Sequence, residues 1–120
     1  MKSKLRAFWT TDTVKSQYEG ARMGIAKACL PLSFKDTTIE QLENFVSATL
    51  SLHEACSAWK AFETPQDVLF WLRRRLIQEA RKPARSAEYR SKCLTVIQEV
   101  EQKIASGFVT QSNHRLSLLE

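Results

Sequence analysis

The chain has 120 residues, of which 43% are hydrophobic and 26% are charged, and its formal net charge is +5 at pH 7. These values exclude a mostly disordered chain and predict a single domain over residues 1–120 with one hydrophobic core. Three glycines and three prolines are too few for the many turns of a β-sandwich or β-barrel. No apolar run approaches the ~20 residues of a membrane-spanning helix, and no apolar segment follows the basic N-terminal residues as in a secretory signal. We therefore expect a cytoplasmic protein with no membrane partner.

The first predicted helix covers residues 13–29, where apolar side chains recur at three- and four-residue steps, and Pro31 ends it. Gly20 and Gly24 stand about one turn apart in this helix. Each glycine costs a helix about 1 kcal/mol relative to alanine, so the pair suggests the close approach of another helix. That helix belongs either to the same chain or to a second copy in a homodimer.

The next two helices are predicted from their first residues. The second covers residues 37–62 and begins at a capping box formed by Thr37 and Glu40. The third covers residues 65–81 and begins at Pro65, whose missing N–H costs nothing at the first helical position.

Pro83 disfavours helical geometry at Lys82 and separates the third helix from a fourth, which we predict over residues 85–106. Gly107 follows the last apolar position of the fourth helix, and a glycine in this place often adopts the left-handed conformation that ends a helix. The sequence therefore predicts that the fourth helix stops at Gly107.

Short connections between four long helices predict an all-α fold, either a four-helix bundle or a related orthogonal array. Residues 1–10 and 108–120 lack a strong helical period, and we expect them to be tails. The tails dock on the bundle or on a partner, and the C-terminal tail is a second candidate surface for a homodimer.

The three cysteines, Cys29, Cys56 and Cys93, are odd in number and widely spaced. This pattern is typical of reduced thiols and not of a disulfide framework. Each cysteine lies on the apolar stripe of a predicted helix, so we expect all three to be unpaired and mostly buried.

The charges are grouped along the chain. Residues 73–92 contain eight basic and two acidic residues, whereas residues 36–67 have a net charge of −5. Arginine outnumbers lysine six to two among the eight, which suits bidentate pairing with phosphate or carboxylate. The candidate residues for binding nucleic acid or an acidic partner are Arg73, Arg74, Arg75, Arg81, Lys82, Arg85, Arg90 and Lys92.

Aromatic residues are interleaved with this basic segment. Trp71 and Tyr89 are candidates for stacking on nucleic-acid bases. An alternative interpretation is that the arginines cover the acidic second helix with its Glu40, Glu43 and Glu54, while the aromatic residues belong to the core. A helix-turn-helix made by the third and fourth helices is less favoured, because the turn lacks a glycine and the fourth helix is long.

Motifs for catalysis and metal binding are absent from the sequence, including Gly-rich phosphate loops, His-Glu-x-x-His and Gly-x-Ser-x-Gly. His53 and Cys56 share a helix face, but a zinc site needs about four ligands and both residues fall on an apolar stripe. We predict no catalytic residue, no metal site and no cofactor.

The sequence therefore predicts a small non-enzymatic regulatory or accessory protein that binds nucleic acid through a basic, Arg-rich strip. The alternative is a protein-binding adaptor or inhibitor, like some phage or plasmid regulators, that docks on an acidic or apolar surface of a larger partner. An exposed basic strip would favour a polyanion, whereas an exposed apolar patch rimmed by arginines would favour a protein partner.

Overall fold

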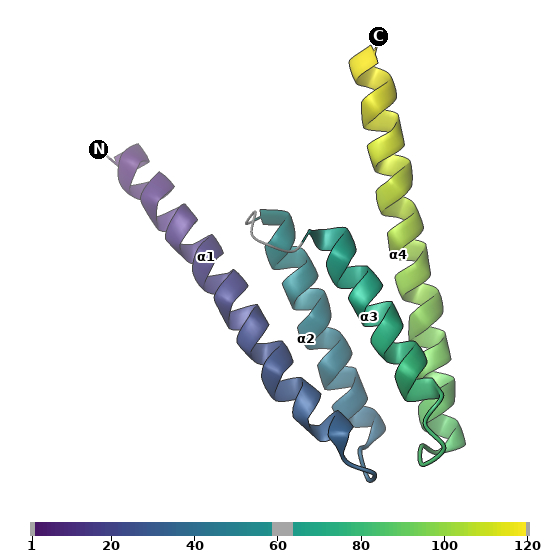
Figure 1. The fold of residues 1–120 in the computed structure, drawn as a ribbon. Helices are drawn as coiled ribbons and strands as arrows, with labels where there is room; N and C mark the ends of the chain where they lie inside the picture. The colour runs from purple at the N-terminus through teal and green to yellow at the C-terminus, as the bar shows by residue number, and fades with distance from the viewer. Residues whose placement is uncertain (1, 59–63, 120) are drawn as a thin grey trace. The chain divides into compact units, whose positions relative to one another are not determined.

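The computed structural model describes the backbone of residues 2–58 and 64–119 and the side chains of residues 13–57 and 64–107. The predicted all-α fold is confirmed, and the described residues form four α-helices and one short 3-10 helix, without a strand. In chain order (Figure 1) these are α1 (Lys2–Cys29), η1 (Leu30–Ser33), α2 (Ile39–Ala58), α3 (Pro65–Ala80) and α4 (Ala87–Leu119).

The chain divides into two compact units, Met1–Val68 and Leu69–Glu120, and each is described by itself. Unit 1 contains α1, η1, α2 and the first turn of α3, whereas unit 2 contains the rest of α3 and α4. The single domain predicted over residues 1–120 stays a prediction.

In unit 1, α1 and α2 form a helical hairpin through η1 (Figure 1). Pro31 lies in the first turn of η1, as expected of a residue that ends α1, and the following Leu32 is fully buried. A hydrophobic cluster joins the two helices and the start of α3. Its buried members are Tyr18, Leu52, Ala55, Cys56 and Val68, with Ala21 and Ile25 packed against them.

The capping box of α2 lies one residue later than predicted. The Thr38 hydroxyl accepts a hydrogen bond from the N–H of Gln41 at 3.1 Å, and the Gln41 side-chain oxygen accepts one from the N–H of Thr38 at 3.0 Å. Thr37 donates its hydroxyl to the same Gln41 oxygen at 2.9 Å. The predicted pairing of Thr37 with Glu40 is therefore wrong, because the helix begins at Ile39 and places Gln41 at its third position.

The start of α3 agrees with the sequence. Thr64 and Asp67 exchange hydrogen bonds between side chain and backbone N–H, both at 3.2 Å, and Pro65 is the first helical residue. The start of α4 is fixed in a similar way, because the Ser86 hydroxyl accepts a hydrogen bond from the N–H of Tyr89 at 3.1 Å.

Both outer helices are longer than predicted. α1 begins at Lys2, so the expected N-terminal tail is helical, and α4 continues through Gly107 to Leu119. No described glycine has a positive φ, so the expected left-handed cap at Gly107 is wrong. A glycine weakens a helix by about 1 kcal/mol but does not end it when the residues on both sides are helical. The predicted end of the second helix, at residues 59–62, lies outside the described residues.

The structure also shows the surroundings of the two glycines of α1 and of the three cysteines. Within the described side chains, no atom lies within 4 Å of where a Cβ would stand on Gly20 or Gly24, so no helix of the same chain approaches either glycine there. None of the three cysteines forms a disulfide, and Cys56 and Cys93 are buried while Cys29 is half-buried.

In unit 2, α3 and α4 form a second hairpin whose apolar stripes are buried. The stripe of α3 contains Leu69, Leu72 and Leu76, and that of α4 contains Tyr89, Cys93, Val96, Ile97, Val100 and Ile104. Across residues 2–58 and 64–119, none of the helices combines the length and apolarity that crossing a bilayer requires.

Candidate functional site

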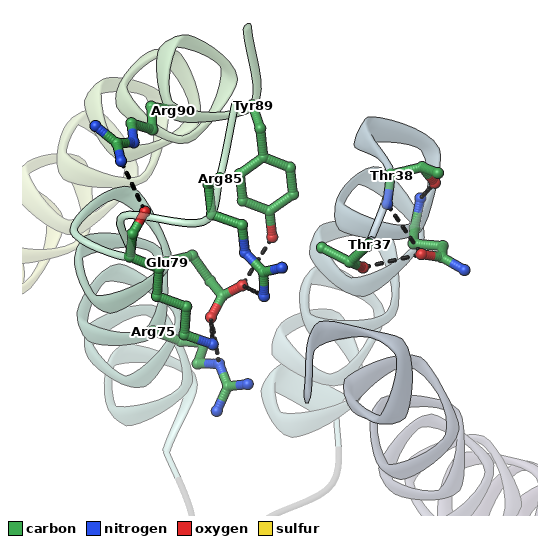
Figure 2. Close-up of polar contacts among 9 residues, drawn as sticks. Thr37, Thr38, Arg75, Glu79, Arg85, Tyr89 and Arg90 are labelled. Carbon is green, nitrogen blue, oxygen red and sulfur yellow. Dashed lines mark hydrogen bonds and ion pairs between the residues drawn. The ribbon is translucent and has the colours of Figure 1, made fainter. Parts of the chain in front are cut away.

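A buried carboxylate organises the turn between α3 and α4. Glu79 is in the last turn of α3, and its side chain is fully buried. One of its oxygens accepts two hydrogen bonds, from Arg85 Nη2 at 2.9 Å and from the Tyr89 hydroxyl at 2.8 Å (Figure 2). Arg85 precedes α4 and Tyr89 lies in its first turn, so this one carboxylate ties α3 to the beginning of α4.

Two further cations approach the second oxygen of Glu79. Lys82 forms an ion pair with it, and Arg75 Nε lies 3.8 Å away, one helical turn earlier. The guanidinium of Arg85 also lies 5.1 Å from the centre of the Tyr89 ring. Three positive charges and one hydroxyl therefore surround a single buried negative charge. We call these five residues, Arg75, Glu79, Lys82, Arg85 and Tyr89, the Glu79 network.

The ionisation of these groups follows from their surroundings. Burial raises the pKa of Glu79, but the hydrogen bonds from Lys82, Tyr89 and Arg85 outweigh it, so the pKa lies below its ordinary value. Burial and the neighbouring Glu79 charge raise the pKa of Tyr89 well above 10. The same two causes, burial first, raise the pKa of the Cys93 thiol to about 11. At neutral pH, Glu79 is ionised while Tyr89 and Cys93 are neutral.

This network contains four of the residues that the sequence suggested for binding: Arg75, Lys82, Arg85 and Tyr89. Arg85 is 7% exposed and Tyr89 is 2% exposed. In this structure the Tyr89 ring offers no face for stacking, and the guanidinium of Arg85 is directed at Glu79. Sequence reasoning counted Glu79 only as one of two acids in a basic segment. The signal that identifies it is its position between basic residues at i−4 and i+3.

Three of the five remaining basic residues of the segment lie in different surroundings. Arg73 pairs with Glu101 of α4 at 3.0 Å, across the seam between the two helices. Arg90 donates a hydrogen bond to the backbone carbonyl of Lys82 at 2.9 Å and so braces the turn (Figure 2). Lys92 is half-buried on α4. The basic segment is therefore distributed over several surfaces instead of forming one strip.

One face of α3 remains exposed and carries both aromatic and basic side chains. Successive steps of about 100° place its members on one side of the helix. Phe70 and Trp71 are 42% and 40% exposed. We call this surface the outer face of α3, and it consists of Phe70, Trp71, Arg74, Gln78 and Arg81.

The two arginines of this face differ from the other arginines of the segment. Arg74 and Arg81 are exposed, and neither forms an ion pair within residues 13–57 and 64–107. They stand seven residues apart, Arg74 within α3 and Arg81 directly after its last residue. Their charges are therefore available to a carboxylate or phosphate outside the chain.

The described side chains hold no group of three or more His, Cys, Asp and Glu residues arranged to bind a metal ion. His53 is half-buried, and Cys56 belongs to the hydrophobic cluster of unit 1. No protein-family model, curated protein or solved structure shows significant similarity to the chain.

Proposed function

We propose that the protein is a small accessory protein that acts by binding, and that it docks on an acidic surface of a larger protein through the outer face of α3. One observation carries this proposal. Exposed Phe70 and Trp71 share a helix face with Arg74 and Arg81, which make no ion pair among the described side chains, whereas the Glu79 network engages other cations of the same segment.

The side-chain types on this face are those that contribute most to protein interfaces. Tryptophan and arginine are enriched among the few residues that dominate binding energy, and aromatic residues are enriched at interface centres. A partially exposed ring loses water-accessible apolar area when a partner covers it. Phe70 and Trp71, at one end of the outer face, would supply the apolar contact area, and Arg74 and Arg81, further along the chain, would pair with carboxylates of the partner.

The distribution of charge also favours an acidic partner. Unit 2 contains ten basic and five acidic residues, a net charge of +5, whereas unit 1 contains eight of each. The excess positive charge of the chain therefore belongs to the unit that carries most of α3. A positive surface increases the rate of encounter with a negative one and disfavours basic partners.

Nucleic acid is the second candidate, and the exposure of Trp71 beside two arginines is the observation that favours it, since bases stack on such rings. Two phosphate contacts would give a slope of about −2 for log affinity against log salt with duplex DNA. Sequence-independent binders usually use more contacts than this. The dispersion of the other basic residues is the reason we favour a protein partner.

The two candidates are separated by measuring binding of defined probes by fluorescence anisotropy. The protein probe is an amphipathic helical peptide with leucines along one face and glutamates seven residues apart, matched by a scrambled peptide of equal charge. The nucleic-acid probes are single-stranded and duplex DNA. The variants are R74E/R81E and W71A, and the control is K15E/K103E, which makes the same charge change at two exposed lysines.

We expect the wild-type protein and K15E/K103E to bind the amphipathic peptide more tightly than its scrambled form. R74E/R81E and W71A should both lose this preference. If DNA binds more tightly than either peptide, and R74E/R81E loses this binding, the partner is nucleic acid and not a protein. Equal behaviour of wild type and R74E/R81E with every probe would reject the outer face of α3 as a binding surface.

A further inference from the structure

A second exposed surface lies in unit 1, on the side of α1 that faces away from the hydrophobic cluster. Met23 lies on α1 and Leu30 directly follows it, seven residues away. They are 63% and 65% exposed, the two highest values among the large apolar side chains that the structure describes. They share this side with small and charged residues. We call it the α1 face, and it consists of Glu19, Gly20, Met23, Ala26, Lys27 and Leu30.

Gly20 leaves open space on the α1 face. It is exposed, and no atom of the described side chains lies within 4 Å of where its Cβ would stand. Small residues on a helix surface let another helix approach its backbone closely. Among the described side chains, those of residues 13–57 and 64–107, none fills this space, which leaves room for a second helix.

The charges of the α1 face are complementary to those of a second α1 face that runs in the opposite direction. Glu19 and Lys27 are both exposed, and each lies four residues from Met23. When two α1 helices run antiparallel and cross at Met23, Glu19 of each copy lies at the level of Lys27 of the other. In the same alignment, Gly20 lies at the level of Ala26, so the two smallest side chains of the face share a layer. A two-fold axis through Met23 thus matches opposite charges and small residues together.

We propose that the α1 face binds a second copy of this chain in an antiparallel, two-fold symmetric homodimer centred on Met23. Met23 of the two copies would be in contact, with Leu30 covering each end of the interface. Two Glu19–Lys27 ion pairs would flank the centre. This surface is separate from the outer face of α3, so the proposal does not depend on the proposed function.

The expected dimer is weak. One helix from each copy buries less than the roughly 1,600 Å² that is typical of a stable interface. Dissociation constants in the micromolar to millimolar range accompany such small contacts, and the net charge of +5 on each copy opposes association further. The dimer should therefore populate only as the protein concentration rises.

Sedimentation equilibrium over a range of concentrations tests the proposal, with charge reversals as the variants. E19K and K27E each replace two ion pairs by two like-charge pairs, and each should weaken dimerisation by roughly tenfold. The double variant E19K/K27E restores opposite charges and should return the dissociation constant to that of the wild type. The controls E54K and K103E make the same changes of net charge at exposed positions of α2 and α4.

The design separates local pairing from overall repulsion, because E19K raises the net charge to +7 while K27E lowers it to +3. Weakening by both, with rescue in the double variant, is expected only for the antiparallel pairing. A wild-type protein that remains monomeric up to about 1 mM, the upper end of the expected range of dissociation constants, overturns the proposal. So does a dimer whose affinity changes equally in E19K and E54K, since its interface then lies elsewhere.

Cross-linking provides a second readout that does not rely on charge. A two-fold axis through Met23 brings residue 23 of both copies together, so M23C should form an intermolecular disulfide under mild oxidation. The wild type, with its three native thiols, is the control for background oxidation. Equal amounts of covalent dimer in M23C and wild type would contradict a crossing point at Met23.

Discussion

At the scale of single residues, the buried Glu79 carboxylate explains why arginines of one basic segment have different surroundings. An isolated carboxylate in a protein interior is unfavourable, so it requires partners that offset the loss of water. Arg85 and Tyr89 donate hydrogen bonds to it, and Lys82 and Arg75 supply further positive charge. Removing the carboxylate would leave the buried Arg85 guanidinium without a compensating charge, which costs more than the network contributes when intact.

The first prediction is that Glu79→Gln destabilises the protein by about 3 kcal/mol, because breaking a buried charge network costs ~3–5 kcal/mol when one partner is removed and glutamine retains part of the hydrogen bonding. For a chain of this size, that lowers the melting temperature by roughly 10 °C. Thermal unfolding followed by circular dichroism measures the change. Glu99→Gln is the matched control at an exposed position of α4, and a loss as small as in this control would show that the network is not structural.

The second prediction concerns pH. The pKa of Glu79 in the folded protein lies below its ordinary value of 4.5, so folding favours the ionised carboxylate. Its stabilising contribution is therefore full above about pH 5 and is lost as the pH falls below 4.5 towards the folded-state pKa. The difference in melting temperature between wild type and Glu79→Gln should shrink over this acidic range. A difference that is constant from pH 7 to pH 3 would contradict the ionised state assigned to Glu79.

At the scale of helices, the spacing of apolar residues predicts where each helix lies. It does not predict which threonine caps α2 or whether α4 ends at Gly107. The 3.6-residue period locates all four helices, and the Thr64 and Pro65 signals place the start of α3 correctly. Thr37 and Thr38 both have a suitable acceptor three residues later, so the spacing did not decide between the two capping boxes. Gly107 is compatible with both a cap and a helix interior, and the structure places it in the interior.

The third prediction separates the two threonines before α2. Thr38→Ala removes the side chain that caps the helix and should cost about 1 kcal/mol, the usual effect of losing an N-cap. Thr37→Ala removes only a hydrogen bond to the Gln41 side chain and should cost less. Chemical denaturation of both variants gives the two free energies of unfolding. A larger loss in Thr37→Ala would restore the capping box first predicted from the sequence.

At the scale of the whole molecule, the sequence reveals the basic segment of residues 73–92. It does not reveal which of these side chains pair with acidic residues of the chain and which remain exposed. Arg81 and Arg85 are four residues apart and chemically identical, yet one is exposed and the other is 7% exposed and bonded to Glu79. The difference arises because the chain turns between α3 and α4 and brings Arg85 back over Glu79. Such a placement depends on tertiary structure, which composition and spacing do not encode. The exposed face contains the arginines that are left when those bonded to Glu79, to Glu101 or to the Lys82 carbonyl are set aside.

We infer that this basic segment contains two separate groups. They are the Glu79 network, which stabilises the α3–α4 hairpin, and the outer face of α3, the surface proposed to bind a partner. The most direct measurement is the melting temperature of R74E/R81E beside that of Glu79→Gln. Exposed charges contribute roughly 0–1 kcal/mol, so R74E/R81E should melt within a few degrees of the wild type while Glu79→Gln melts about 10 °C lower. If R74E/R81E melts as low as Glu79→Gln, Arg74 and Arg81 are structural residues and the division into two groups is incorrect.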